Sequence, residues 1–351
     1  MWSELLVGYG IFILELLTIL LAIAAIVALI AVLKQRKSNQ GELQLTDLSE
    51  QYEENVQKLH DFHLSEEELK AQHKAEKKAE KAKSKQEKMR LKKGEAITET
   101  SKPSLYVIDF KGDIMASQTA ALSQELNAIL AVAKPEDEVL LRLESPGGVV
   151  HGYGLAASQL ARLKQKGIKL TVVIDKVAAS GGYMMACVAD KIISAPFAII
   201  GSIGVVAQVP NIHRLLKKHD VDVDVMTAGE FKRTVTLLGE NTEKGKQKFQ
   251  QELEETHQLF KNFVSQHRSQ LDLDQVATGE HWFGQQALDL HLVDEIGTSD
   301  DVILHALQEK RVINVKYIIK KSLTQKLSKQ AEESADNLLL KWLKRNDHQL
   351  L

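Results

Sequence analysis

The sequence is poor in cysteine, proline and aromatic residues. One cysteine among 351 residues excludes an internal disulfide framework and any cysteine-rich zinc site. Five prolines and 20 glycines exclude a collagenous or linker-like composition. The 45 basic and 47 acidic side chains nearly cancel, so the basic excess of a general nucleic-acid binder is missing. The histidines lack metal-ligand spacing, and we expect no metal, no cofactor and no nucleic-acid partner.

One long apolar run is present, from Leu5 to Leu33, broken mainly by Glu15. It exceeds the roughly 20 residues that a membrane-spanning helix needs. A basic segment ahead of a short core, the mark of a cleaved signal peptide, is missing. The sequence therefore predicts a single-pass anchor and its flank over residues 1–37, with the lipid bilayer as a partner. Three basic residues follow the run, so the positive-inside rule favours a cytoplasmic body.

The polar stretch that follows, residues 38–103, is rich in Lys, Glu, Ala and Gln. These are good helix formers, but no apolar stripe is present to pack them against a core. We expect a charged stalk, helical or disordered. Contact of its lysines with anionic lipid headgroups is a second interpretation.

Strand-like and helix-like segments alternate after Ser104, which is typical of an α/β core. Strands are expected at 105–110, 139–144, 170–174, 192–193, 204–209 and 221–226, and helices at 116–133, 152–165, 182–188 and 243–269. We assign residues 104–310 to one domain and 311–351 to a C-terminal strand and amphipathic tail. The tail is expected to pack as a last helix, with docking on a membrane or another subunit as the alternative.

Three short segments carry candidate chemistry. Glycines in Glu144–Gly148, between a strand and a helix, allow backbone N–H groups to hold an oxyanion. Ser180 lies on a tight turn of small residues, where its hydroxyl can protrude as a nucleophile. No Ser-His-Asp arrangement is visible, which leaves a lysine, Lys232, as the candidate base if burial favours its neutral form. Each segment alone is more typical of a turn or a helix cap.

Together, these segments resemble the signal peptide peptidase A family of membrane-anchored serine proteases, and within it the SohB-type inner-membrane members. The matching residues are Ser145-Pro146-Gly147-Gly148, Ala179-Ser180-Gly181-Gly182-Tyr183, Gly201-Ser202-Ile203-Gly204-Val205, Gly229-Glu230-Phe231-Lys232-Arg233 and Phe283-Gly284-Gln285-Gln286-Ala287.

The resemblance implies a ClpP/crotonase-like superhelix of ββα units. It implies that Ser180 is the nucleophile, that Lys232 is the general base and then the acid, and that the N–H groups of Gly147 and Gly181 form the oxyanion hole. It also implies polypeptide substrates, such as signal-peptide remnants or unfolded membrane-associated proteins, and a homo-oligomer in which the lysine can come from another subunit.

Two other functions remain open on the sequence alone. A crotonase-type acyl-CoA enzyme would share the fold and the oxyanion glycines but would not need the serine or the lysine. A catalytically inactive membrane scaffold would need neither. The resemblance also implies a location in the bacterial inner membrane with an extracytoplasmic catalytic domain. This is the opposite of the cytoplasmic body that the positive-inside rule weakly favours.

Overall fold

The computed structural model describes residues 41–65, 67–69 and 102–318, together with the single positions 18, 72, 74, 81, 85 and 89. Residues 45–316 form one compact unit, and residues 1–44 and 317–351 are grouped in a second. The predicted anchor, most of the predicted stalk and the tail beyond residue 318 lie outside the described residues. Within the described residues, no helix has the length and apolar character needed to cross a bilayer.

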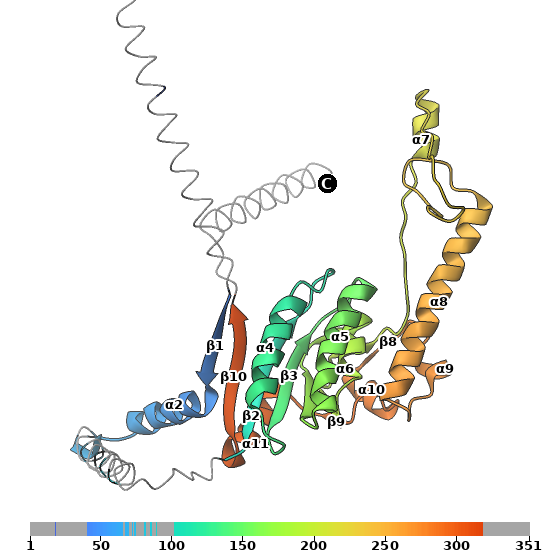
Figure 1. The fold of residues 1–351 in the computed structure, drawn as a ribbon. Coiled ribbons are helices and arrows are strands. Elements are labelled where there is room, and N and C mark those ends of the chain that lie inside the picture. The colour runs from blue at the N-terminus through green and yellow to red at the C-terminus, as the bar shows by residue number, and fades with distance from the viewer. Residues whose placement is uncertain are drawn as a thin grey trace, which may run out of the picture. The chain divides into compact units, whose positions relative to one another are not determined.

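A seven-stranded sheet forms the body, with the strand order β1-β10-β2-β3-β4-β6-β9 (Figure 1). The pairings from β10 to β9 are all parallel. The strands are β1 (Glu42–Asp47), β2 (Ser104–Lys111), β3 (Glu138–Glu144), β4 (Lys169–Ile174), β6 (Lys191–Ser194), β9 (Glu295–Ile296) and β10 (Arg311–Ile318). The predicted α/β class is confirmed.

Helices connect the parallel strands, as right-handed crossovers require. They are α4 (Thr119–Val132), α5 (Val150–Gln165), α6 (Gly181–Ala186), α8 (Glu243–His267), α9 (Leu273–Val276), α10 (Gly284–Asp289) and α11 (Ser299–Glu309). The two helices α4 and α5 lie side by side on the sheet (Figure 1). Apolar residues of α11 pack on a buried cluster that includes Leu105, Val107 and Val312. The core therefore lies between the sheet and its helices.

The first strand and helix of the described chain belong to this body. The helix α2 (Leu48–Phe62) begins at Asp47, whose carboxylate caps it by accepting the N–H of Ser49. The same carboxylate accepts a hydrogen bond from Arg311 at 2.8 Å, and the Ser49 hydroxyl accepts the N–H of Val312 at 2.9 Å. The stretch expected to be a stalk therefore starts inside the sheet. The polar composition of this stretch gives no sign of β1, because β1 is stabilised by contacts with residues far away in the sequence, such as that between Asp47 and Arg311, which are 264 residues apart.

A second, three-stranded sheet lies next to the carboxyl ends of β3 and β4. It consists of β5 (Val177–Ala179), β7 (Ile199–Gly201) and β8 (His281–Phe283). Ser145, directly after β3, bridges to Ala178 of β5 and so ties the two sheets together. The strand expected at 204–209 is wrong, because the pairing strand is β7, which ends at Gly201.

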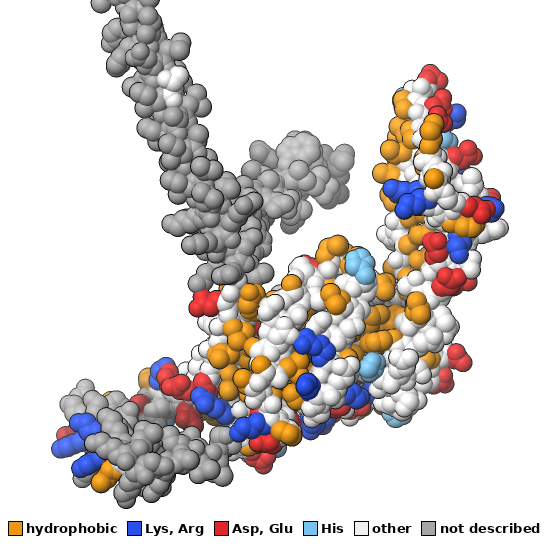
Figure 2. Space-filling model, in the orientation of Figure 1, with side chains coloured by type: hydrophobic (Ala, Val, Ile, Leu, Met, Phe, Trp, Pro, Cys, Tyr) orange, Lys and Arg blue, Asp and Glu red, His pale blue; other side chains and the backbone are white. Residues whose placement is uncertain are grey.

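Residues 205–242, here called the arm, connect this second sheet to α8. They contain α7 (His213–Lys218), which stands away from the sheet at the outer end of α8 (Figure 1). The strand expected at 221–226 is also wrong, since these residues form an irregular segment. Its apolar side chains are exposed rather than paired in a sheet, and Met226 is 90% exposed. Hydrophobic side chains are visible along the arm in Figure 2.

Candidate active site

Ser180 occupies a strained turn between β5 and α6. Its φ of 52° and ψ of −118° lie in a region that residues other than glycine rarely adopt. The turn is held because the Ser180 N–H donates to the Gly201 carbonyl of β7 at 2.8 Å and the Ser180 carbonyl accepts the N–H of Met184 at 3.0 Å. A non-glycine residue fixed in this way at a strand-to-helix corner is a recurring mark of a functional serine.

A cavity of about 820 Å³ opens at this turn, and Ser180 and Gly181 are part of its wall. Ile114, Thr278 and Gly279 contribute to the remaining wall, together with three longer segments. Gly147 and Gly148 follow β3, Ser202 and Gly204 follow β7, and His257 and Phe260 belong to α8. Apolar and backbone groups dominate this wall, and no shared metal-ligating cluster exists among the described residues. The cavity therefore offers a mainly apolar surface beside the Ser180 turn.

Gly147 packs directly against the serine turn. A Cβ atom at this position would approach the Ser180 Cβ and the Gly181 N to 2.8 Å, and its φ of +88° also favours glycine. The Gly147 N–H donates to the Ser145 hydroxyl at 3.1 Å. Among the hydrogen bonds of the described residues, none engages the N–H of Gly148 or Gly181, and both residues line the cavity. Gly148 and the sequence candidate Gly181 are therefore the donors that can meet an oxyanion, whereas the N–H of the sequence candidate Gly147 is already engaged by Ser145.

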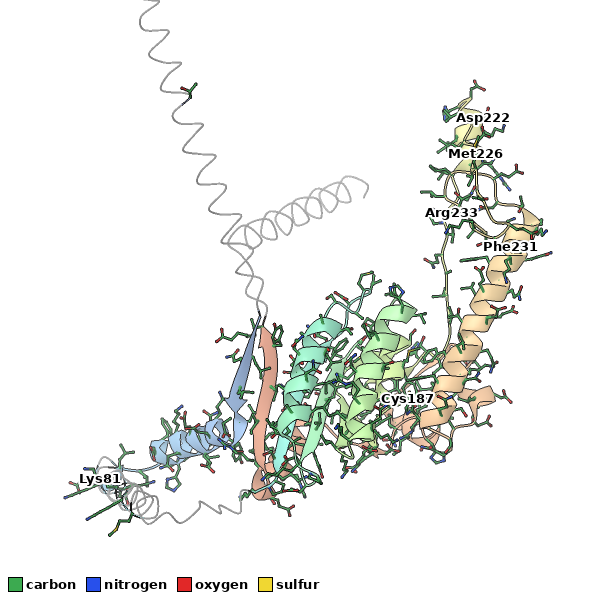
Figure 3. All side chains as sticks on the ribbon, viewed as in Figure 1. Lys81, Cys187, Asp222, Met226, Phe231 and Arg233 are labelled. Atoms are coloured by element: carbon green, nitrogen blue, oxygen red, sulfur yellow. The ribbon has the colours of Figure 1, made fainter. Side chains whose placement is uncertain are left out.

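Lys232 lies elsewhere, on the exposed surface of the arm. Its neighbours Phe231 and Arg233 stand at the outer end of α8, while Cys187, just beyond α6, lies in the body (Figure 3). Lys232 lines a groove of about 780 Å³ whose walls include Val225 and Leu237. No residue lines both this groove and the serine cavity. A single copy of the chain thus does not bring Ser180 and Lys232 together.

The local surroundings of Lys232 differ from the buried site expected from the sequence. Phe231 remains partly exposed and lies under the ammonium groups of Lys244 and Lys248, at 5.7 and 5.8 Å from its ring centre. Glu230 pairs with Lys244. The groove wall mixes apolar with polar side chains, among them Asp224 and Arg233, and Lys232 itself is exposed.

His257, which was not among the residues predicted from the sequence, reaches the serine cavity from the middle of α8. Its Nε2 lies 3.2 Å from the carbonyl oxygen of Ile203, in the segment that also carries Ser202. No local motif marks this histidine, because only the packing of α8 on the body brings it to the cavity. By contrast, Cys187 is a core residue as predicted, fully buried, and burial raises the pKa of its thiol to about 12.

Comparisons with known proteins show the family of the chain. The family model "Peptidase family S49" matches residues 162–313, and "Peptidase family S49 N-terminal" matches residues 4–160. The chain is 68% identical over 340 residues to "Probable protease SohB" of Haemophilus influenzae, covering 97% of this chain and 96% of that protein. It is 54% identical over 247 residues to the protein of the same description from Buchnera aphidicola (subsp. Acyrthosiphon pisum), covering 70% and 74%.

Among solved structures, the chain is similar to a mutant of the "1510-N membrane-bound stomatin-specific protease" in complex with a substrate peptide. The identity is 14%, with a TM-score of 0.40, over 66% of this chain and 99% of that one. The sequence relatives define the class of the protein as a serine-type peptidase. More particularly, the chain belongs to peptidase family S49, as the resemblance to the signal peptide peptidase A family predicted.

Proposed function

We propose that this peptidase is a membrane-anchored endopeptidase that uses Ser180 as its nucleophile and Lys232 as its base. The observation that carries the proposal is the strained Ser180 turn at the cavity wall, with the N–H groups of Gly148 and Gly181 lacking protein partners beside it. The sequence-predicted oxyanion donor Gly147 packs on the same turn.

The chemistry follows from these groups. The neutral Lys232 amine accepts the Ser180 hydroxyl proton as Oγ attacks the scissile carbonyl carbon, and the carbonyl oxygen becomes an oxyanion held by backbone N–H groups. As the tetrahedral intermediate collapses, the ammonium returns the proton to the leaving amine, and an acyl-enzyme ester remains. The same amine then takes a proton from water, whose oxygen attacks the ester carbon. As the ester bond breaks, the ammonium returns this proton to Ser180 Oγ, which frees the carboxylic acid product and restores the hydroxyl and the neutral amine.

The lysine that serves a given Ser180 comes, in this proposal, from a second copy of the chain. Lys232 lines its own groove on the arm, separate from the serine cavity. The arm exposes apolar side chains, with Leu215 56% and Met226 90% exposed, and surfaces of this kind mark protein interfaces. Covering the open side of the Lys232 groove with a partner would remove water from the amine and favour its neutral form.

The remaining sequence predictions belong to the same proposal. The fold is a ClpP/crotonase-like superhelix, residues 1–37 anchor the chain in the inner membrane, residues 38–103 contain the stalk, residues 104–310 hold the peptidase, and residues 311–351 contain a strand and an amphipathic tail. Substrates are signal-peptide remnants or unfolded membrane-associated proteins, and the catalytic domain is extracytoplasmic. The apolar cavity wall supports an apolar, extended substrate.

The test is hydrolysis of an unfolded protein by the detergent-solubilised full chain, beside Ser180→Ala and Lys232→Ala. Both variants are expected to lose hydrolysis while keeping the thermal stability and assembly size of the unaltered protein. Lys218→Ala removes an exposed cation of the arm that lines neither the groove nor the serine cavity, so it is the matched control for Lys232 and is expected to retain activity. Full activity in Ser180→Ala would contradict the proposed nucleophile, and full activity in Lys232→Ala the proposed base.

A further inference from the structure

A continuous hydrogen-bond chain lies buried directly behind the serine turn. It runs from the Gly147 N–H to the Ser145 hydroxyl at 3.1 Å, from Ser145 to the Tyr153 phenol at 2.6 Å, and from Tyr153 to the Asp113 carbonyl oxygen at 2.8 Å. The side chains of Ser145 and Tyr153 are both fully buried. None of these groups takes part in the proton transfers described above.

The direction of each hydrogen bond in this chain is fixed by chemistry. A carbonyl oxygen only accepts, so the Tyr153 hydroxyl donates to Asp113. Ser145 must then donate to the Tyr153 oxygen, and its own oxygen accepts from the Gly147 N–H. Burial, as the main cause, raises the pKa of the Tyr153 phenol, so this donor keeps its proton. Each hydrogen bond in the chain therefore has a single possible donor and a single possible acceptor.

The same residues pack against the serine turn itself. A Cβ atom on Gly181 would meet the Tyr153 ring at 2.4 Å, and a Cβ atom on Gly182 would meet the Ser145 carbonyl oxygen at 2.5 Å. Ser145 also exchanges backbone hydrogen bonds with β5, since its N–H donates to Val177 and its carbonyl accepts the N–H of Ala179. The segment that carries Gly147 and the segment that carries Ser180 are thus held by one buried pair.

We propose that Ser145 and Tyr153 are positioning residues for the oxyanion site. Ser145 and Tyr153 hold the buried Gly147 N–H on the side away from the cavity. This fixes the orientation of the next peptide group, between Gly147 and Gly148. Among the described residues, the N–H of the exposed Gly148 then has no protein partner and lies beside Gly181. The inference rests on the proposed hydrolysis at Ser180. It predicts that losing the chain impairs stabilisation of the oxyanion and leaves substrate binding intact.

Two single-atom variants test the proposal in the full-length, detergent-solubilised protein. Ser145→Ala removes the acceptor of the Gly147 N–H but keeps the Tyr153–Asp113 bond, and Tyr153→Phe removes the phenol oxygen but keeps the ring against Gly181. Tyr183→Phe is the matched control, because it removes another buried phenol–carbonyl bond, to Leu292 at 2.9 Å, without touching Gly147.

With an internally quenched peptide, kcat is expected to fall about tenfold to a hundredfold in the two test variants, less than the 10²–10³ lost with an entire oxyanion donor. KM should change less than about twofold, because ground-state binding does not use the oxyanion site. A peptide aldehyde adds reversibly to the Ser180 hydroxyl to give a hemiacetal, and its affinity should fall in parallel with kcat. Tyr183→Phe should lower thermal stability about as much as Tyr153→Phe while kcat is kept.

Unchanged kcat and aldehyde affinity in a folded Ser145→Ala or Tyr153→Phe protein would overturn the positioning role. A kcat loss of equal size in Tyr183→Phe would overturn it as well, since a general packing defect would then explain the effect. Failure of the proposed function is distinguishable, because hydrolysis would then persist in Ser180→Ala, whatever the two positioning variants do.

Discussion

The separation of Ser180 from Lys232 predicts that two inactive variants restore each other's activity. In a mixed assembly of Ser180→Ala and Lys232→Ala chains, a working site pairs the serine of one variant with the lysine of the other. Random assembly from equal amounts places an intact serine at about half of the sites and an intact lysine beside about half of those, so about one quarter of the normal activity returns. If one chain supplied both groups, no activity would return.

The assay co-expresses equal amounts of the two variants, purifies all assemblies through a tag common to both chains, and verifies with a second, variant-specific tag on each chain that mixed assemblies are present. Hydrolysis of an unfolded protein is then compared with each variant alone, which is expected to be inactive. A second mixture, the double variant with the unaltered chain, gives an independent number. Pairing between copies predicts about one quarter of normal activity there, whereas pairing within a copy predicts about one half. No activity in the first mixture, with both tags present in one assembly, would refute the reasoning.

Two further predictions concern stability. Arg268 is 4% exposed and makes two hydrogen bonds of 2.8 Å to Asp294, whose side chain is 31% exposed. Arg268→Ala should therefore lower the free energy of unfolding in urea by about 3 kcal/mol, near the low end of the range for breaking a buried ion pair. Burial, the largest single influence, would raise the pKa of Asp294, but the hydrogen bonds from Arg268 and the Ile192 N–H and the charges of Arg268 and Lys191 together lower it. This stabilisation should therefore be complete above the ordinary value of 3.8 and decline as the pH falls below it. The decline should be smaller in Arg268→Ala. Gly154→Ala, in the interior of α5 with no atom within 4 Å of the new Cβ, should raise stability by about 0.5–1 kcal/mol. Gly181→Ala should instead lower the melting temperature and abolish hydrolysis, because its Cβ collides with the Tyr153 ring. Equal melting temperatures for the two variants would contradict this packing argument.

The parts of the fold that the sequence predicted correctly are those in which local pattern and burial agree. The strands β2, β3 and β4 read as apolar runs because parallel strands in this sheet are covered by helices. The long helix α8 was recognised from its spacing of apolar residues. Ser180 and the glycines near it were found because a tight turn depends on the residues that form it.

The failures have a common physical cause in the arm. The residues at 204–209 and 221–226 have the apolar pattern of strands, yet Val206 and Met226 are exposed. An exposed apolar segment and an apolar strand in a core have the same composition, so sequence pattern does not separate them. Ser145 and Tyr153 were overlooked as a pair because their contact depends on how α5 packs behind β3, which no local spacing encodes.

The position of β10 in the sheet affects the order in which the chain folds. This last strand lies between β1 and β2, so β1 has no neighbour in the sheet until the residues from Arg311 onward have been made. The Asp47–Arg311 contact closes a loop of 264 residues, and contacts of such length form late and slowly. During synthesis, β1 therefore stays unpaired, and so does the edge of β2 that later pairs with β10. The sheet is completed only after the ribosome has made the residues of β10. A chain that stops before Arg311 would leave both β1 and the edge of β2 without partners and open to pairing with other chains.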